Sequence, residues 1–295
     1  MISISAMTVS PKLCLLQLAA PFDDVELAYV EWGNPAAERI VVCVHGLTRN
    51  ARDFDVLAAA LAESGARVIA VDVVGRGRSS WLKDPLGYSA LTYAAHIGQL
   101  CRTLGLARVD WIGTSMGGIV GMIFAATNPT AIGRLILNDV GPSIDQSALA
   151  QIAVYVGLDL KFEGLDDIER HFRNIHAGFG KLSDDQWRHM AIHSARQDTD
   201  GWRLSYDPAI RVLHVEGAKQ DMDLWAMWEK IACPTFVLRG GESRILTAAT
   251  AARMASTGPK AEIVTIQGVG HAPALMDEEQ IETVKRWLGV DRDKP

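Results

Sequence analysis

The sequence contains no cluster of positive charge. Its 295 residues include 29 lysines and arginines against 35 aspartates and glutamates, which gives a formal net charge of -6. Nucleic acids and anionic membrane surfaces are bound by clustered lysine and arginine, and no basic run here is longer than a pair. The charge pattern therefore argues against a nucleic-acid partner and against a membrane partner.

Cysteine is scarce and scattered. None of the four cysteines forms a CxxC pair or lies at a ligand-like spacing from a histidine, which a zinc site would require. The sequence therefore predicts free, buried thiols in a reducing compartment, no metal and no other cofactor. We therefore expect the protein to be cytoplasmic. The four cysteines are Cys14, Cys43, Cys101 and Cys233.

Long apolar runs are also missing, and none approaches the ~20 residues that span a membrane as a helix. The first 21 residues lack a basic region, and Gln17 interrupts their apolar part, so they predict a strand rather than a signal peptide. Repeats and low-complexity tracts are absent. The hydrophobic fraction of 48% is typical of a globular protein with a sizeable core.

Strand and helix signals alternate over the first 140 residues. The run RIVVCVHG is rich in β-branched residues, as expected for a strand that is buried on both faces. The βαβα order predicts an α/β fold with a mostly parallel sheet and helices on both faces. Strands are predicted over 13–19 and 25–32 as an antiparallel pair, then over 39–46, 66–75, 108–113 and 132–141, with helices over 50–65, 91–105 and 116–129.

The β-branched runs disappear between residues 142 and 230. Amphipathic helical patterns replace them, and four of the eight tryptophans lie there. The alternation then resumes, with strands predicted over 234–240 and 261–268 and helices over 247–256 and 277–289. We predict a core formed by 1–141 and 231–295, with an inserted helical cap over 142–230, here called the cap segment.

The stretch WIGTSMGG places Gly113-x-Ser115-x-Gly117 between a predicted strand and a predicted helix. A serine at such a sharp turn is held in strained backbone geometry, and small residues on either side let the chain pass. The strain lifts the serine hydroxyl above the sheet, beside the free N–H groups of the helix N-terminus. The pattern predicts Ser115 as a nucleophile.

Two further segments complete this chemistry. In VHGLTRN, a His-Gly turn after a buried strand can direct the backbone N–H of Leu47 at an oxyanion, together with that of Met116. In GVGHAP, His271 lies in a glycine-flanked loop after the last predicted strand. This position predicts His271 as the general base.

The segments GTSMGG, HG, DVVGRGRS, LNDVGP and GVGHAP, in this order, resemble the α/β-hydrolase superfamily. The resemblance covers the chain apart from the cap segment. It implies the α/β-hydrolase fold, with an eight-stranded sheet whose loops hold a Ser–acid–His triad. It implies a hydrolase and does not select the substrate.

The position of the acid is unusual. Many members of the superfamily carry it in a stretch similar to RGxxSDxL, where this sequence has Arg244 in the aspartate position. Asp139, at the end of the strand that follows the elbow helix, is our first candidate, because some members carry the acid there and the order Ser–Asp–His is preserved. Glu242, two residues before Arg244, is the alternative acid.

Other readings of these residues stay open. Asp139 in LNDVGP also suits a turn into the cap segment. Asp277 resembles part of a helix capping box, and Asp72 is more plausible as an organiser of the GRGRS turn. Arg244 is either a solvated surface residue or a residue of the pocket mouth that favours an anionic substrate.

The sequence predicts a serine hydrolase that cleaves carboxylic esters of small to medium acyl chains through an acyl-enzyme. Hydrolysis of a C–C bond in a ring-cleavage product, and amide hydrolysis of a small acid, use the same triad and remain alternatives. A non-catalytic receptor on this fold is the alternative of another class. The expected partner is a small-molecule ester, and a homodimer is an arrangement that the sequence allows.

Overall fold

A computed structural model describes residues 9–290 of the chain. Eight strands form one sheet in the order β1-β2-β4-β3-β5-β6-β11-β12. β2 runs antiparallel to both its neighbours, and the other neighbouring pairs are parallel. The strands are β1 (Lys12–Gln17), β2 (Glu26–Trp32), β3 (Ile40–Val44), β4 (Arg67–Val71), β5 (Val109–Thr114), β6 (Ile132–Asn138), β11 (Thr235–Gly240) and β12 (Glu262–Ile266). The predicted eight-stranded, mostly parallel sheet is confirmed.

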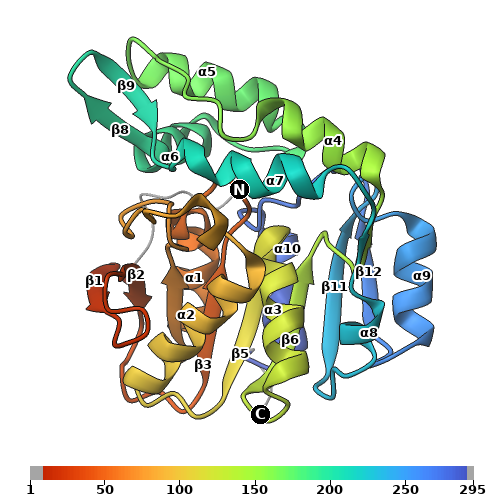
Figure 1. Cartoon of the computed structure of the whole chain (residues 1–295). Helices are drawn as coiled ribbons and strands as arrows, with labels where there is room; N and C mark the ends of the chain where they lie inside the picture. The colour runs from red at the N-terminus through yellow and green to blue at the C-terminus, as the bar shows by residue number, and fades with distance from the viewer. Residues whose placement is uncertain (1–8, 291–295) are drawn as a thin grey trace.

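Helices cover both faces of this sheet (Figure 1). On one face α2 packs against α3, which also contacts α8, and on the other face α1 contacts α10. These helices are α1 (Asp55–Glu63), α2 (Ala90–Thr103), α3 (Met116–Thr127), α8 (Trp225–Trp228), α9 (Ala248–Ser256) and α10 (Glu278–Leu288). The central strands are buried on both sides, because Val41, Val42 and Val44 have no exposed surface.

Most of the chain between β6 and β11 lies over the end of the sheet, whereas α8 lies beside β11 (Figure 1). It contains the helices α4 (Gln146–Tyr155), α5 (Leu165–Ile175), α6 (Asp184–Ser194) and α7 (Arg211–Gly217). It also contains two small antiparallel pairs that the sequence did not predict, β7 (Ser143–Ile144) with β10 (Met222–Asp223) and β8 (Ala195–Asp198) with β9 (Gly201–Leu204). The helical pattern that the sequence shows in this region is interrupted after Ser194, because the following residues form the hairpin of β8 and β9, which turns at Thr199 and Asp200.

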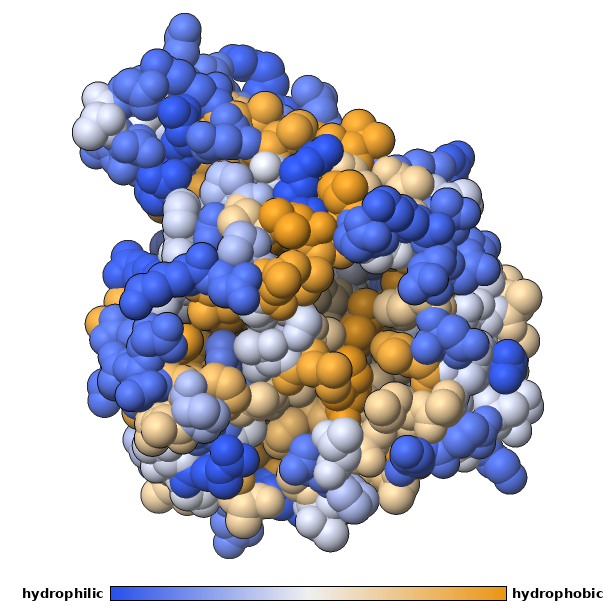
Figure 2. Space-filling model, viewed as in Figure 1, coloured by the Kyte–Doolittle hydropathy of each residue, from blue (hydrophilic) through white to orange (hydrophobic). Residues whose placement is uncertain are grey.

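All four cysteines are free thiols, as predicted, and three of them are buried. Burial raises the pKa of Cys101 to about 12 and also raises that of Cys43, so neither thiol ionises readily. Hydrophobic residues gather on the surface where the cap segment meets the rest of the molecule (Figure 2). Among residues 9–290, no helix combines the length and the apolar character needed to cross a bilayer.

Candidate active site

Ser115 lies at the turn between β5 and α3 in a conformation that few residues other than glycine adopt, with φ 52° and ψ −115°. Two glycines make the turn possible. A Cβ atom at Gly113 would lie 2.3 Å from the Gly117 carbonyl oxygen, and one at Gly117 would lie 1.9 Å from the Val44 carbonyl oxygen. The small residues of the GxSxG pattern are therefore required by the close approach of neighbouring backbone.

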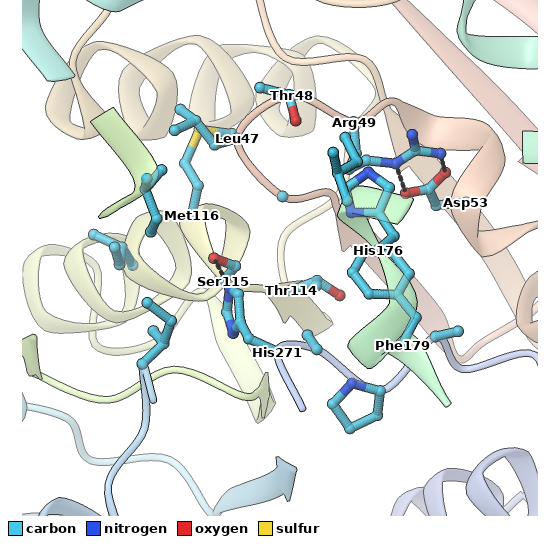
Figure 3. A pocket seen from close by; sticks show the side chains of 18 of the residues that line it. Leu47, Thr48, Arg49, Asp53, Thr114, Ser115, Met116, His176, Phe179 and His271 are labelled. Carbon is cyan, nitrogen blue, oxygen red and sulfur yellow. Dashed lines mark hydrogen bonds and ion pairs between the residues drawn. The ribbon is translucent and has the colours of Figure 1, made fainter. Parts of the chain in front are cut away.

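Ser115, His271 and Asp139 form one hydrogen-bonded chain. Nε2 of His271 lies 2.8 Å from Oγ of Ser115, and Nδ1 lies 2.7 Å from Oδ2 of Asp139. His271 comes from the loop between β12 and α10, and Figure 3 shows its ring directed at Ser115. The arrangement can take a proton from the serine hydroxyl while the carboxylate fixes the tautomer of the imidazole.

Asp139 is fully buried at the end of β6, the strand next to β5. Its backbone has φ 57°, a left-handed conformation that aspartate tolerates better than most residues. Its second oxygen, Oδ1, accepts a hydrogen bond of 2.8 Å from the backbone N–H of Gly240, on β11. Both oxygens are thus partnered, and the carboxylate is held in one orientation toward His271.

The other acidic candidates lie elsewhere. Within the described part of the chain, the Glu242 side chain has no hydrogen bond to His271, and both Glu242 and Arg244 are exposed outside the cavity lining. Asp277 caps α10 by accepting from the N–H of Glu279. The expected reciprocal bond of a capping box is replaced, since the Gln280 side chain accepts from the Leu275 N–H instead.

Asp72 organises the turn after β4. Its two oxygens accept from the backbone N–H groups of Ala51 and Arg78, at 2.8 and 2.9 Å. Burial raises the pKa of Asp72 to about 6, against the opposing effect of these hydrogen bonds. Asp72 therefore ties the GRGRS turn to the segment that follows VHGLTRN.

The His-Gly turn supports the loop of Leu47. His45 is fully buried, accepts from the Val73 N–H at Nε2 and donates from Nδ1 to the Gly46 carbonyl, at 3.0 and 2.7 Å. Burial lowers its pKa to about 3, so the imidazole is neutral and structural. Leu47 and Met116, the two residues predicted to serve an oxyanion, line the cavity beside Ser115 (Figure 3).

A cavity of about 170 Å³ opens around Ser115 and His271. Most of its wall is apolar, and α4 contributes Leu149, Ile152 and Tyr155. None of the four tryptophans of the cap segment belongs to the lining. The methionines of the lining are Met116, Met190 and Met276.

The cavity wall also has polar residues that the sequence analysis missed. Arg49 is 5% exposed and pairs with Asp53 through two hydrogen bonds of 2.8 and 2.6 Å, on the same loop as Leu47 and Thr48 (Figure 3). His176 and His214 line the cavity, and the described structure gives Nε2 of each no partner. Isolated histidines in helical segments carry no sequence signal for such a position.

Both of these imidazoles are held neutral. Burial, followed by the charge of Arg49, lowers the pKa of His176 well below 6.5. Burial, followed by the charge of Arg76, lowers the pKa of His214 to about 4. The wall therefore presents two neutral histidines beside a guanidinium whose charge is paired with Asp53.

Outside the cavity, one group of side chains consists of residue types that can bind a metal ion. Among the described residues, single ligand atoms of Asp55, His189 and His193 lie within 4.8 Å of one another, a set that the sequence analysis did not identify. Arg52 already occupies the Asp55 carboxylate through an ion pair, and Nε2 of His189 lies 3.1 Å from that carboxylate. None of the three ligands lines the cavity around Ser115.

Comparisons with known proteins agree with this geometry. The sequence profile of the alpha/beta hydrolase fold matches residues 39–277, and the chain therefore belongs to that family. A 3-hydroxybutyrate-oligomer hydrolase of Cupriavidus necator is 40% identical to it over 291 residues, which cover 96% of this chain and 99% of that protein. The protein described here is thus a hydrolase of the α/β fold.

Solved structures show the same fold over nearly the whole chain. A protein from Rickettsia typhi has a TM-score of 0.86 at 33% identity and covers 96% of this chain and 99% of its own. An alpha/beta hydrolase from Novosphingobium aromaticivorans has a TM-score of 0.81 at 33% identity, with the same coverage. Because each of these structures covers 96% of this chain, the structural match includes the cap segment as well as the sheet.

Proposed function

We propose that this protein is a serine hydrolase that cleaves carboxylic esters of small to medium acyl chains through an acyl-enzyme. The observation that carries the proposal is the hydrogen-bonded chain from Ser115 through His271 to Asp139, with distances of 2.8 and 2.7 Å. A nucleophile, a base within reach of it and a carboxylate that orients the base are the parts that acyl transfer requires.

In this mechanism Oγ of Ser115 attacks the ester carbonyl while Nε2 of His271 takes its proton. The N–H groups of Leu47 and Met116 hold the oxyanion of the tetrahedral intermediate. His271 then gives the proton to the leaving alcohol, and the acyl-enzyme forms on Ser115. Water, deprotonated by His271, attacks the acyl-enzyme and releases the acid.

We further propose esters of short hydroxy acids as substrates. The similarity to the 3-hydroxybutyrate-oligomer hydrolase supports this class. The cavity chemistry agrees with it, because apolar residues surround neutral His176 and His214 and a charge-paired Arg49. Uncharged ester and hydroxyl oxygens can hydrogen-bond to neutral imidazoles without the cost of burying another charge.

The cap segment, 142–230, is proposed as a separate unit that shapes this cavity. Its helices α4 and α6 supply Leu149, Ile152 and Met190 to the lining. Acyl-chain preference is then expected to follow substitutions in the cap segment, whereas the reacting atoms belong to residues 1–141 and 231–295.

Steady-state hydrolysis of graded p-nitrophenyl esters and of a 3-hydroxybutyrate dimer tests the proposal, with Ser115→Ala as the paired variant. We expect turnover of short esters and of the dimer by the wild type, loss of turnover in the variant, and labelling of Ser115 by a fluorophosphonate. A small-acid amide and a ring-cleavage diketo acid belong in the same panel. Faster turnover of either than of every ester, or no labelling of Ser115, would contradict the ester assignment.

A further inference from the structure

Arg76, in the GRGRS turn after β4, is a fully buried cation. Every nitrogen of its guanidinium contacts a neutral group. The contacts are Nε to the Leu47 carbonyl at 2.9 Å, Nη1 to the Val74 carbonyl at 2.9 Å and to the Tyr93 hydroxyl at 2.8 Å, and Nη2 to Sδ of Met116 at 3.6 Å. One side chain therefore contacts both residues whose N–H groups we assign to the oxyanion.

The charge of Arg76 has no direct counterion. A guanidinium stays protonated in proteins, and in the part of the chain that the structure describes it forms no ion pair. The carboxylate of Asp207 accepts from the Ala209 N–H and from the hydroxyl of Tyr88, whose ring centre lies 5.7 Å from Cζ of Arg76. Burial of an unpaired charge is costly, so its retention beside Ser115 calls for a role.

The electrostatic influence of this cation reaches the residues around the nucleophile. Burial is the largest cause of the lowered pKa of His214 in the cavity wall, and the charge of Arg76 is the second. The charge of Arg76 also contributes to the lowered pKa of His45. A positive charge that makes protonation of nearby imidazoles unfavourable makes a nearby negative charge favourable by the same Coulomb interaction.

The turn that carries Arg76 is itself fixed. The Arg78 N–H donates to Asp72, the Gly77 N–H donates to the Ser205 carbonyl at 2.7 Å, and the Asp207 N–H donates to the Gly75 carbonyl at 2.8 Å. These bonds hold the guanidinium in place before any substrate binds. A preorganised charge stabilises a developing oxyanion without reorganising during the reaction.

We propose that Arg76 is the positioning residue of the oxyanion hole: it holds the Leu47 carbonyl and the Met116 side chain, and it supplies the buried positive charge that favours the tetrahedral oxyanion. This inference rests on the proposed function, because it assumes acyl transfer at Ser115. The negative charge exists in the transition state and not in the neutral ester. Loss of Arg76 is therefore expected to reduce kcat and to leave KM almost unchanged.

The test compares Arg76→Met, Arg76→Gln and Arg76→Lys with the wild type on p-nitrophenyl butyrate, with active sites counted by fluorophosphonate labelling. We expect the two neutral variants to lose about 10- to 100-fold in kcat with KM within about threefold. The inhibition constant of butylboronic acid, which forms an anionic tetrahedral adduct with serine, should rise by the same factor as kcat falls. Arg76→Lys, which keeps the charge, should recover part of both losses.

Arg78→Met is the matched control, because Arg78 is exposed two residues further along the same turn. It should leave kcat and boronic acid affinity unchanged. The inference is overturned if a folded Arg76→Met or Arg76→Gln keeps kcat within threefold, if kcat falls while boronic acid affinity does not, or if Arg76→Lys is no better than either. A wild type without esterase activity or boronic acid affinity would overturn the proposed function and this inference together.

Discussion

At the residue scale, the position of Asp139 distinguishes this site. We propose Asp139 as the acid, at the end of the strand next to β11, whereas the resemblance to the superfamily would place it at the position of Arg244. Its left-handed backbone, with φ 57°, and the bond from the Gly240 N–H direct Oδ2 at His271. An amide at position 139 would keep the size of the side chain and lose the negative charge that stabilises the imidazolium.

We therefore expect Asp139→Asn to lower kcat by about 10⁴-fold for any ester that the wild type hydrolyses. Glu242→Gln is the paired control, because Glu242 is exposed and should not affect turnover. Steady-state kinetics at pH 7 to 8 measure both variants. Near-wild-type turnover by Asp139→Asn, together with a loss in Glu242→Gln, would transfer the acid role to Glu242.

Gly117 provides a second prediction at this scale. An alanine Cβ there would lie 1.9 Å from the Val44 carbonyl oxygen, and both groups belong to buried backbone that cannot move aside cheaply. Gly117→Ala should cost at least about 3 kcal/mol of stability in urea denaturation. Gly217→Ala is the control, since no atom lies within 4 Å of its added Cβ and α7 already ends there. It should be neutral or stabilising by up to about 1 kcal/mol.

At the scale of elements, the strands of the sheet were predictable because they are short apolar runs bounded by turns, and β3, β4 and β12 are also rich in β-branched residues. The elbow was predictable because its glycines are required sterically. The hairpin of β8 and β9 was not, because the amphipathic period of α6 continues into its first residues and only the Asp-Gly turn breaks it. One half of the capping box predicted for α10 is present, because Asp277 accepts from the Glu279 N–H. The other half is not, because the Gln280 side chain accepts from the Leu275 N–H.

The N-cap residue of α10, Asp277, gives the prediction at the scale of elements. Asp277→Ala removes the acceptor of the Glu279 N–H and should cost about 1 kcal/mol of unfolding free energy. Asp277 does not line the cavity, so kcat should stay within about twofold. Urea denaturation and ester kinetics on the same preparation measure the two quantities. A large fall in kcat with unchanged stability would instead give Asp277 a role in the chemistry.

Only part of the site could be predicted from the sequence, because some of its residues are brought together by tertiary packing alone. Ser115, Asp139 and His271 each had a local signal, whereas His176, His214 and Arg76 had none. Their positions depend on how the cap segment and the GRGRS turn pack around the nucleophile, which sequence spacing does not encode. The sequence alone likewise left open whether Asp139 or Glu242 is the acid. The register of β6 and β11 places the Gly240 N–H against Asp139, and this contact favours Asp139.

At the scale of the whole molecule, buried histidines tie stability to pH. Six of the eight histidines have a pKa lowered chiefly by burial. His96 is the simplest case, because it is 2% exposed, lies edge-on against Phe22 and has a pKa lowered to about 4. The unfolded chain takes up a proton near pH 6.5, whereas the folded protein does so only near pH 4.

Between these values the unfolded state binds more protons, so stability rises with pH. The contribution of His96 is complete above pH 6.5 and is lost as the pH falls toward 4. His96→Leu should therefore reduce the slope of unfolding free energy against pH in this window, by up to about 1.4 kcal/mol per pH unit. Urea denaturation at several pH values measures the slope, and an unchanged slope would show that His96 is protonated in the folded protein.

The placement of the acid on β6 also changes which parts of the chain are open to redesign. With Asp139 as the acid, the nucleophile and the acid lie within 25 consecutive positions on adjoining strands, 115–139. The end of β11 then contributes the main-chain N–H of Gly240 to the site, and the turn after β11 contributes Ile245 to the cavity lining. The exposed side chains of Glu242 and Arg244 are therefore natural positions to randomise in a library, whereas buried Ser243, which accepts from the Ile245 and Leu246 N–H groups, should be kept.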